Sequence, residues 1–480
     1  MKTNIALIKK YNIDILLLVS FFLWRINTGL FPESFNYDDS HEILIYRTDS
    51  LYDFFAFADH HLLYSLLLYV WLLFISINSI QIINIVFCIC IVFVTKHMYT
   101  KFSFGYWPFI LNIFVLFNSP IFMDYSLRIK QYTLDYLLIL LLINLLLDVQ
   151  TDSITLNRFF LFGVLFSTFS LILLPVFSVF TIFVLHKRVK SFNLPLLLIP
   201  LILIIFFHFI GIVRLKIFDP EFFNYYSYSF NSGSGIGREI QNLFFNFLIL
   251  VRGISDNGYL ALFLLLFLFG LIQIYKSKSI LLYVFLLVLT IFSILHLLDL
   301  YPMGGGRNMI FIYPLVLILF SHNIKITKNK VLVLILVILN IFTITSFANF
   351  NYPDTYIKIL IEDIGNQDLT IVDYYSIPQY TLYQDEVTTK ISRRYSLEED
   401  CLYSSNTESI LFLQNNRCKS IDIETIELKI LEEYETINII SEYNTINSID
   451  DFESFFSKGG YVLEDKVEYK KSYKLVYGRK

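Results

Sequence analysis

The sequence reads Leu-Asp-Tyr-Leu-Leu-Ile-Leu-Leu-Leu-Ile-Asn-Leu-Leu-Leu over residues 134–147. Apolar residues fill this run almost without interruption, whereas a helix packed on a soluble core shows polar residues every three or four positions. Similar blocks occur at 13–24, 194–207, 260–274 and 331–347. Runs that approach 18–20 apolar residues match the ~30 Å hydrocarbon core of a bilayer. The sequence therefore predicts an α-helical membrane protein with many spans.

The overall composition agrees with this fold class. Hydrophobic residues make up 56% of the 480 residues and charged residues 16%, against roughly 25% charged residues in soluble domains. The net charge of −4 gives no reason to expect a nucleic-acid partner. Cys88 and Cys90 lie in an apolar run, and Cys401 and Cys418 can pair only if the C-terminal part lies outside the cytoplasm.

Charge patterning predicts the orientation. No small-x-small cleavage site follows the first apolar run, which we interpret as a retained span with a cytoplasmic N-terminus. With about eleven spans, short basic clusters fall on the cytoplasmic side. The cytoplasmic segments are residues 9–10, 96–101, 157–158, 186–190, 276–278 and 325–330, and five of these six are basic clusters. The opposite loops carry most of the acidic residues, at 33–59, 124–135, 219–221, 256 and 299. We therefore expect a multi-pass protein of the cytoplasmic membrane.

Two parts of the chain need separate treatment. The apolar stretch 61–76 fits a re-entrant or membrane-surface helix on the outer side, and whether it crosses the bilayer stays open. After residue 347 the charge density rises and the long apolar runs stop. We expect residues 1–348 to form the membrane domain and 349–480 a small extracytoplasmic α/β domain. Its expected strands are 369–372, 410–413 and 437–440, its expected helices 355–364 and 421–431, and its expected hairpin 461–477 with a turn near 465–471.

Acidic residues gather in the expected outer loop 31–78. Asp38 and Asp39 are adjacent, and Glu42 follows three residues later. In a helix, one of the two aspartates shares a face with Glu42. Such a carboxylate can act as a general base toward a hydroxyl or amine, or, with a partner, hold a divalent cation. The alternative is a solvated acidic loop without catalytic function.

Basic and aromatic residues gather in three further segments on the same predicted side. His60 and His61 can contact a phosphate or a metal, or simply follow a helix cap. Arg128 and Tyr132 are four residues apart, which predicts one helical face. Arg307 follows three glycines at the mouth of a span. Arginine suits phosphate because its guanidinium forms a planar donor fork, but both arginines can equally be interfacial anchors.

The order of these features resembles the GT-C fold glycosyltransferases, specifically bacterial relatives of protein O-mannosyltransferases and of the lipid A aminoarabinose transferase. In that family an Asp-Glu pair opens a large outer loop after the first span, and here Asp38 and Asp39 stand at that place. Asp38 corresponds to the first acid of the family. The change of the second acid to Asp39 leaves open which of the two carboxylates activates the acceptor.

Three other elements are similar to family motifs. His60-His61-Leu62-Leu63-Tyr64 stands where the family has His-Pro-Pro-Leu-Tyr, without the prolines. The segment from Arg128 to Tyr132 is similar to an Arg-x-Tyr element with altered spacing, and Arg307 followed by Pro314 fits a late outer-side arginine. The resemblance implies transfer of a sugar from a polyprenyl-phosphate donor to a lipid, glycan or protein acceptor. Many members need no metal, although some GT-C enzymes use one.

Other functions stay open on sequence alone. A polysaccharide polymerase or ligase that acts on lipid-linked oligosaccharides also has many spans and outer-side arginines. A transporter or flippase carries its site near the bilayer midplane, and His208 is one of few ionisable residues deep in an expected span. The last alternative is a membrane receptor without enzymatic activity.

Overall fold

The computed structural model describes residues 12–26, 39–40, 43–44, 62–150, 155–169, 173–188, 280–297, 307–319, 357–362, 364, 368–373, 376–384, 387–389, 403–405, 409–413, 426, 431–442, 449–469 and 472–480. Contacts divide the chain into two compact units. The first unit comprises Met1–Leu30, Asp59–Leu67 and Gln81–Phe350, and the second Phe31–Ala58, Leu68–Ile80 and Asn351–Lys480.

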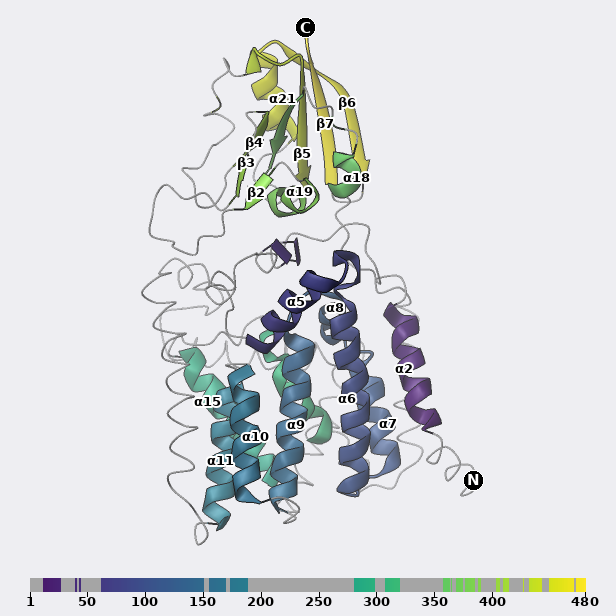
Figure 1. Cartoon of the computed structure of the whole chain (residues 1–480), viewed down its shortest axis with the longest axis vertical. Helices are drawn as coiled ribbons and strands as arrows, with labels where there is room; N and C mark the ends of the chain where they lie inside the picture. Colours follow the sequence, from purple (N-terminus) through teal and green to yellow (C-terminus); the bar gives the residue numbers. More distant parts are fainter. Residues whose placement is uncertain are drawn as a thin grey trace. The chain divides into compact units, whose positions relative to one another are not determined.

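The first unit is helical in its described part (Figure 1). Its elements are α2 (Ile13–Ile26), α6 (Ile82–Lys101), α7 (Tyr106–Leu116), α8 (Pro120–Leu127), α9 (Tyr132–Gln150), α10 (Leu156–Phe169), α11 (Leu173–Arg188), α15 (Ile280–Leu297) and the 3-10 helix η3 (Arg307–Ile312). Helix α5 (Leu62–Phe74) begins in this unit and ends in the second, where η1 (Ile77–Ser79) follows it. The expectation of a helix over 61–76 is thus confirmed, while its position in the membrane stays a prediction.

Two described helices, α6 and α9, are long and apolar enough to cross a membrane. Helices α7 and α8 together form a third candidate span, bent by 67° at their junction. The bend has a local cause: Pro120 lacks a backbone N–H and so begins a new helix. Ser119 caps that helix, because its Oγ accepts a hydrogen bond from Phe122 N over 3.2 Å.

Side-chain contacts fix the direction of these helices. Thr133 at the start of α9 bonds to Asn84 at the start of α6. Lys101 at the end of α6 pairs with Asp148 near the end of α9, with 2.5 Å between Nζ and Oδ1. The two helices therefore run parallel. The chain between them, α7 and α8, returns along the length of α6, about 26 Å from residue 84 to residue 101 at 1.5 Å per residue. The length, composition and direction of this path fit a broken span or a re-entrant loop.

The first helix runs opposite to α6, because Lys96 donates to Asn12 Oδ1 over 2.9 Å and to Asp14 Oδ1 over 2.6 Å. The starts of α2 and the ends of α6 and α9 consequently share one end of the helical unit. The sequence placed 96–101 and 157–158 on one side and 124–135 on the other, and the structure separates these segments along α6 in the same way. Which end faces the cytoplasm stays a prediction.

Two expectations about the membrane domain need correction or stay open. Residues 96–101 belong to α6 and are not a loop, because Lys96 and Lys101 are neutralised by ion pairs and the helix continues through both. The apolar stretch at 79–94 accordingly belongs largely to a helix that begins at Ile82 and ends at Lys101. The apolar runs 194–207, 260–274 and 331–347 lie outside the described residues, so about eleven spans remain an expectation.

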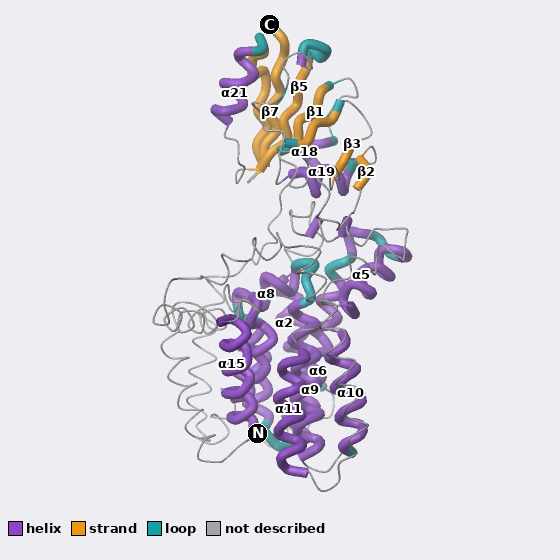
Figure 2. The backbone as a smooth tube through the Cα atoms, turned by 90° about the vertical axis from the view of Figure 1, so that its left-hand side faces the viewer, coloured by secondary structure: helices purple, strands orange, loops and turns teal. Residues whose placement is uncertain are grey.

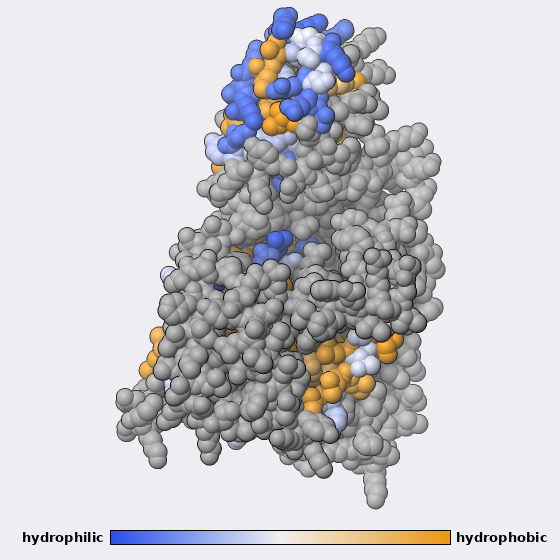
Figure 3. Space-filling model, turned by 180° about the vertical axis from the view of Figure 1, so that it is seen from behind, coloured by the Kyte–Doolittle hydropathy of each residue, from blue (hydrophilic) through white to orange (hydrophobic). Residues whose placement is uncertain are grey.

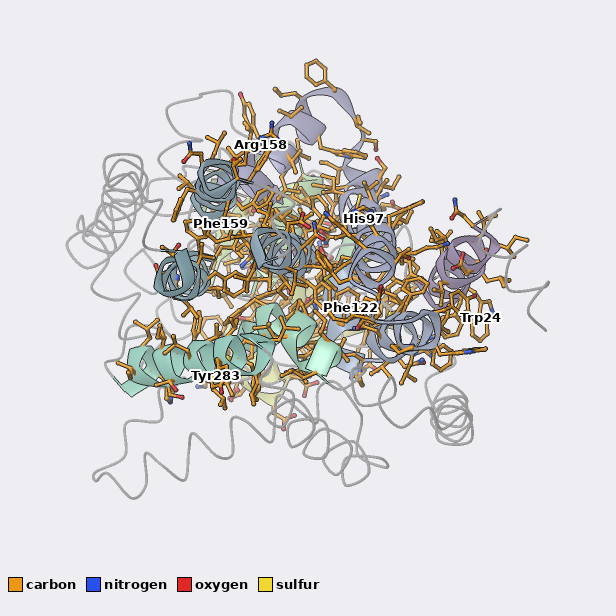
Figure 4. The ribbon with its side chains drawn as sticks, turned by 90° about the horizontal axis from the view of Figure 1, so that it is seen from below. Trp24, His97, Phe122, Arg158, Phe159 and Tyr283 are labelled. Atoms are coloured by element: carbon orange, nitrogen blue, oxygen red, sulfur yellow. The ribbon has the colours of Figure 1, made fainter. Side chains whose placement is uncertain are left out.

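Burial separates the inward and outward faces of the helices. Phe122 lies among the helices of the first unit, whereas Trp24 and Tyr283 lie at its periphery (Figure 4). Phe122 is 0% exposed and Trp24 57% exposed. Hydrophobic side chains are visible on the described surface of the helices, and hydrophilic ones on much of the sheet domain (Figure 3). Large apolar side chains on the outside of helices suit a lipid environment.

The C-terminal part of the second unit is a small α/β domain, as expected from the sequence (Figure 2). Its five-stranded sheet has the order β4-β1-β5-β7-β6, and β2 and β3 form a separate pair. The elements are α18 (Ile357–Ile361), β1 (Leu369–Val372), α19 (Ile377–Tyr383), β2 (Val387–Thr389), β3 (Tyr403–Ser405), β4 (Ile410–Phe412), β5 (Thr436–Glu442), α21 (Ile449–Lys458), β6 (Tyr461–Tyr469) and β7 (Ser472–Arg479). Strands β4, β1 and β5 are parallel, and β7 is antiparallel to both β5 and β6.

One face of this sheet packs against α21. Phe452 and Phe456 are four residues apart on the helix, and both are fully buried. The ring centroid of Phe456 lies 4.7 Å from that of Tyr477 in β7. Gly460 then adopts φ +82°, a conformation that favours glycine, and turns the chain from the helix into β6. The core of the domain therefore lies between α21 and the sheet.

The sequence predicted this domain closely but not completely. The strand predictions 369–372, 410–413 and 437–440 are confirmed, and the helix expected at 355–364 is the shorter α18. The hairpin at 461–477 is confirmed, but residue 465 lies within β6, because the strand continues to Tyr469. Most of the helix expected at 421–431, and both Cys401 and Cys418, lie outside the described residues.

Candidate functional site

Arg128 occupies a junction of three segments in the helical unit. Helix α8 ends at Leu127, and α9 begins at Tyr132. The expectation that Arg128 and Tyr132 share one helical face is wrong, because Arg128 adopts an extended backbone (φ −83°, ψ 154°) that interrupts the helix. The junction leaves the backbone of residues 128–131 outside the two helices, where its polar groups need other partners.

Asn84 supplies partners for that backbone. Its Nδ2 donates to the carbonyl of Arg128, and its Oδ1 accepts from the hydroxyl of Thr133 over 3.0 Å. Asn84 and Thr133 are 1% and 0% exposed, so the bond between their side chains forms away from water, where polar contacts are stronger. One amide of α6 thus holds the end of α8 and the start of α9 together.

The Arg128 side chain is positioned by its own helix. Its Nε lies 2.9 Å from Oδ2 of Asp124, one helical turn earlier. Its Cζ lies 5.4 Å from the ring centroid of Tyr125, in the geometry of a cation–π contact. The Tyr125 ring in turn packs edge-on against Tyr132, with 4.6 Å between centroids. Arg128 and Tyr132 are therefore linked through Tyr125, although they do not share a helix.

The segment that carries Arg307 lies against the same elements. Arg307 is the first residue of η3, and η3 packs against both α8 and α9. Met309 and Ile312 in η3 are buried, and Phe311 stacks near Phe292 of α15 with 4.5 Å between ring centroids. The backbone of Arg307 is described, but its side chain is not. The structure thus brings together two segments that the sequence placed on one side of the membrane.

Of the three acidic residues proposed for the site, the structure describes only Asp39. Asp39 is fully buried, together with Ser40, so this carboxyl group is not part of a solvated loop. A buried carboxylate is costly unless it is paired or used. Asp38, Glu42, His60 and His61 lie outside the described residues. Asp39 belongs to the second unit and Arg128 to the first, so each is considered by itself.

The arrangement around Arg128 is suited to binding an anion. A guanidinium carries five N–H donors, and the Nε of Arg128 lies within ion-pair distance of Asp124. Fixing an arginine with a carboxylate and an aromatic ring lowers the entropy lost when it binds a ligand. The side chain is 22% exposed, so it is partly shielded but accessible. Phosphate and carboxylate groups are the anions that match the planar donor fork.

Sequence reasoning missed the residue that organises the junction. Asn84 stands in the run Ile82-Ile83-Asn84-Ile85, and a lone amide among apolar residues of an expected span was the available signal. Its partners could not be read from the sequence, because Arg128 and Thr133 are more than forty residues away. Comparisons with protein-family models, curated proteins and solved structures find no match for this chain.

Proposed function

We propose that this protein is a membrane glycosyltransferase with a GT-C-like arrangement of about eleven spans. It transfers a sugar from a polyprenyl-phosphate donor to a lipid, glycan or protein acceptor on the outer face of the cytoplasmic membrane. The observation that supports it most is that η3, which begins at Arg307, packs against α8 and α9, the two helices that flank Arg128. An anion-binding arginine beside apolar helices is what a lipid-linked phosphate requires.

In this proposal, Asp38 acts as the base and removes the proton of the acceptor hydroxyl. The acceptor oxygen forms a bond to the anomeric carbon, and the bond from that carbon to the phosphate oxygen breaks. The polyprenyl phosphate leaves with an added negative charge. Asp39 or Glu42 supports the base, and Arg128 and Arg307 stabilise the departing phosphate. His60, His61 and Tyr132 complete the donor site.

The described helices of the first unit carry their buried ionisable residues near the helix ends, and His208 lies outside the described residues. In the described helices of the first unit, buried charged or histidine side chains lie in the first or last two turns of their helices. They are Asp14, Arg25, Asp135, Asp148 and His296. Transporters instead place ionisable groups near the bilayer midplane. A ligase that uses lipid-linked oligosaccharides would use the same arginines, so the choice of donor distinguishes it.

The test is transfer of radiolabelled sugar from polyprenyl-phosphate monosaccharides in membranes that contain wild-type or Asp38→Asn protein. We expect label in a lipid, glycan or protein product with the wild type only, because the amide keeps the shape of the carboxylate and removes the base. Chelation with EDTA, followed by Mg²⁺ or Mn²⁺, shows whether a divalent cation takes part. Transfer only from lipid-linked oligosaccharides would support the polymerase or ligase alternative. Normal transfer by both Asp38→Asn and Asp39→Asn would refute the assigned site.

A further inference from the structure

The carboxyl ends of β1 and β5 lie side by side in the C-terminal sheet (Figure 2). From β1 the chain continues through α19, β2 and β3 to β4 on one side. From β5 it continues through α21 to β6 and β7 on the other side. Neighbouring parallel strands whose connections leave in opposite directions form a topological switch point. Open α/β sheets bind ligands outside the carboxyl ends of the strands at such points.

Polar side chains gather on both faces of the sheet at this switch point, because successive residues of β5 point to opposite faces. Asp373 directly follows β1, and its Oδ2 accepts a hydrogen bond from Ser441 Oγ over 2.9 Å. Gln379 of α19 donates from Nε2 to Oε1 of Glu442 over 2.7 Å. Asp373, Ser441 and Gln379 are each 0% exposed. Two hydrogen bonds therefore join the segment after β1 to the last two residues of β5.

Three further polar atoms in this place have no hydrogen-bond partner among the described residues. They are Ser376 Oγ, Gln379 Oε1 and Ser472 Oγ, and all three residues are 0% exposed. Each unsatisfied buried group destabilises the folded state. Native proteins keep few such groups, and each calls for an explanation.

These unpartnered atoms belong to the cluster itself. Ser472 is the cross-strand neighbour of Glu442, and the Gln379 amide is held against the Glu442 carboxylate. The Ser472 hydroxyl and the Gln379 carbonyl oxygen therefore lie beside one carboxylate. Ser376 directly precedes α19 and makes no side-chain capping bond to it, and its N–H bonds to the carbonyl of Asp373. Both ends of the cluster thus present buried polar atoms that a bound ligand can satisfy.

The chemistry of the cluster selects the class of ligand. The two carboxylates accept hydrogen bonds from Ser441 and Gln379, and their negative charge disfavours an anion. Serine hydroxyls both donate and accept, whereas the glutamine oxygen only accepts. The groups of a ligand that donate and accept from the same atom are hydroxyls. We propose that the carboxyl ends of β1 and β5 bind a saccharide, an assignment of ligand class that rests on the proposed glycosyltransferase function.

This site gives the C-terminal domain a role in the reaction. Gln379, Glu442 and Ser472 would hold an acceptor saccharide whether or not the donor phosphate is bound. Binding can therefore be measured without any donor, and it is independent of the acidic pair Asp38 and Asp39. A failure of the proposed transfer reaction and a failure of this site are consequently separate results.

The experiment uses the full chain in nanodiscs with glucose, mannose, galactose, N-acetylglucosamine, maltose and lactose as probes. Hydrogen–deuterium exchange of residues 438–442 and 472–476 reports binding. We expect at least one sugar to slow exchange saturably. Ser472→Ala and Ser376→Ala should each weaken the apparent affinity about tenfold, the ratio for one lost hydrogen bond. Ser457→Ala, at an exposed serine of α21, is the matched control and should bind normally.

Thermal unfolding of the variants shows whether a loss of sugar binding results from misfolding. Without sugar, Ser472→Ala should unfold at the same or a higher temperature than the wild type, because it removes an unpaired buried hydroxyl. Loss of sugar binding with undiminished stability would support a ligand site. No protection by any of the six sugars, equal binding by both serine variants, or protection by phosphate or Ca²⁺ in place of sugar would overturn the proposal. Sugar binding that persists in Asp38→Asn while transfer is lost would support both proposals together.

Discussion

Asn84 and Thr133 lie 3.0 Å apart, from Oδ1 to Oγ1, at the starts of two parallel apolar helices. The same Asn84 side chain donates to the carbonyl of Arg128. A single buried amide therefore couples the packing of α6 and α9 to the position of a candidate phosphate-binding arginine. Buried polar bonds of this kind specify one geometry, because an alternative packing would leave each partner unsatisfied.

The first prediction concerns Asn84. Asn84→Leu should lower transfer about 100-fold, since a displacement of about 1 Å at a binding group can cost that much. Thr133→Val should have a smaller effect, because the bond to the Arg128 carbonyl remains. Sugar transfer in membranes, normalised to folded protein, measures both. Asn112→Leu is the matched control: Asn112 is also a buried amide in an apolar helix, but it bonds to Tyr99. Equal losses in the Asn84 and Asn112 variants would point to a general packing defect.

The second prediction concerns the donor fork of Arg128. Arg128→Lys keeps the charge but loses the planar fork and the contact geometry with Asp124 and Tyr125. We expect KM for the polyprenyl-phosphate donor to rise about 10-fold, corresponding to ~1.4 kcal/mol, with a smaller change in kcat. Steady-state kinetics over a range of donor concentrations resolves the two parameters. Arg158→Lys, at an exposed arginine of α10, should leave both unchanged. An unaltered KM in Arg128→Lys would remove Arg128 from the donor site.

The sequence allowed the C-terminal strands to be predicted because their signals are local. Strand β1 is a buried β-rich run bounded by polar residues, and the structure places it at Leu369–Val372. The site at its carboxyl end could not be predicted in the same way. Glu442 meets Ser472 only through strand register, and Gln379 reaches Glu442 across sixty-three residues. Hydrophobic periodicity predicts which face is buried, but it carries no information about such partners.

In the helical unit, too, the sequence predicted the helices but not the contacts between them. Apolar runs indicated the helices α6 and α9. Charge patterning predicted that residues 96–101 and 124–135 lie on opposite sides of the membrane. The prediction that Arg128 and Tyr132 share a helical face was nevertheless wrong, because a four-residue interval gives a shared face only if the helix is continuous. Helix α8 ends before Arg128. The guanidinium of Arg128 then lies beside Tyr125, and its carbonyl accepts a hydrogen bond from Asn84. Departures from local rules of this kind are expected at functional sites.

The third prediction concerns the ion pair between Lys101 and Asp148. Asp148 is 6% exposed and Lys101 33% exposed, so the pair is intermediate between surface and buried pairs. Asp148→Asn should destabilise the helical unit by about 2 kcal/mol, a value between those for the two extremes. Thermal unfolding in detergent monitors the loss. The exchange variant Lys101→Asp/Asp148→Lys should recover most of it, and failure to recover would show that the pair is not a stabilising contact between α6 and α9.

The fourth prediction compares two tyrosines of the sheet domain. Tyr461 donates to the carbonyls of Leu431 and Tyr434, whereas the hydroxyl of Tyr477 has no partner among the described residues. Tyr461→Phe should lower the free energy of unfolding by about 1–3 kcal/mol, because the two carbonyls that share the phenolic hydrogen lose their donor. Tyr477→Phe should be neutral or stabilising at pH 7, because an unpaired hydroxyl is removed. Hydrogen–deuterium exchange of β5 and β7 in the full chain measures both changes.

The ionisation of Tyr477 should also make the stability of the sheet domain depend on alkaline pH. Burial raises the pKa of Tyr477 well above its ordinary value, and the nearby acidic Glu453 raises it further. The folded state therefore holds the phenolic proton more tightly than the unfolded state, and stability falls as pH rises above about 10. Tyr477→Phe cannot lose this proton, so its sheet should keep more of its exchange protection between pH 9 and pH 11 than the wild type. Parallel loss of protection in the two proteins would show that the ionisation of Tyr477 is not coupled to unfolding of the sheet.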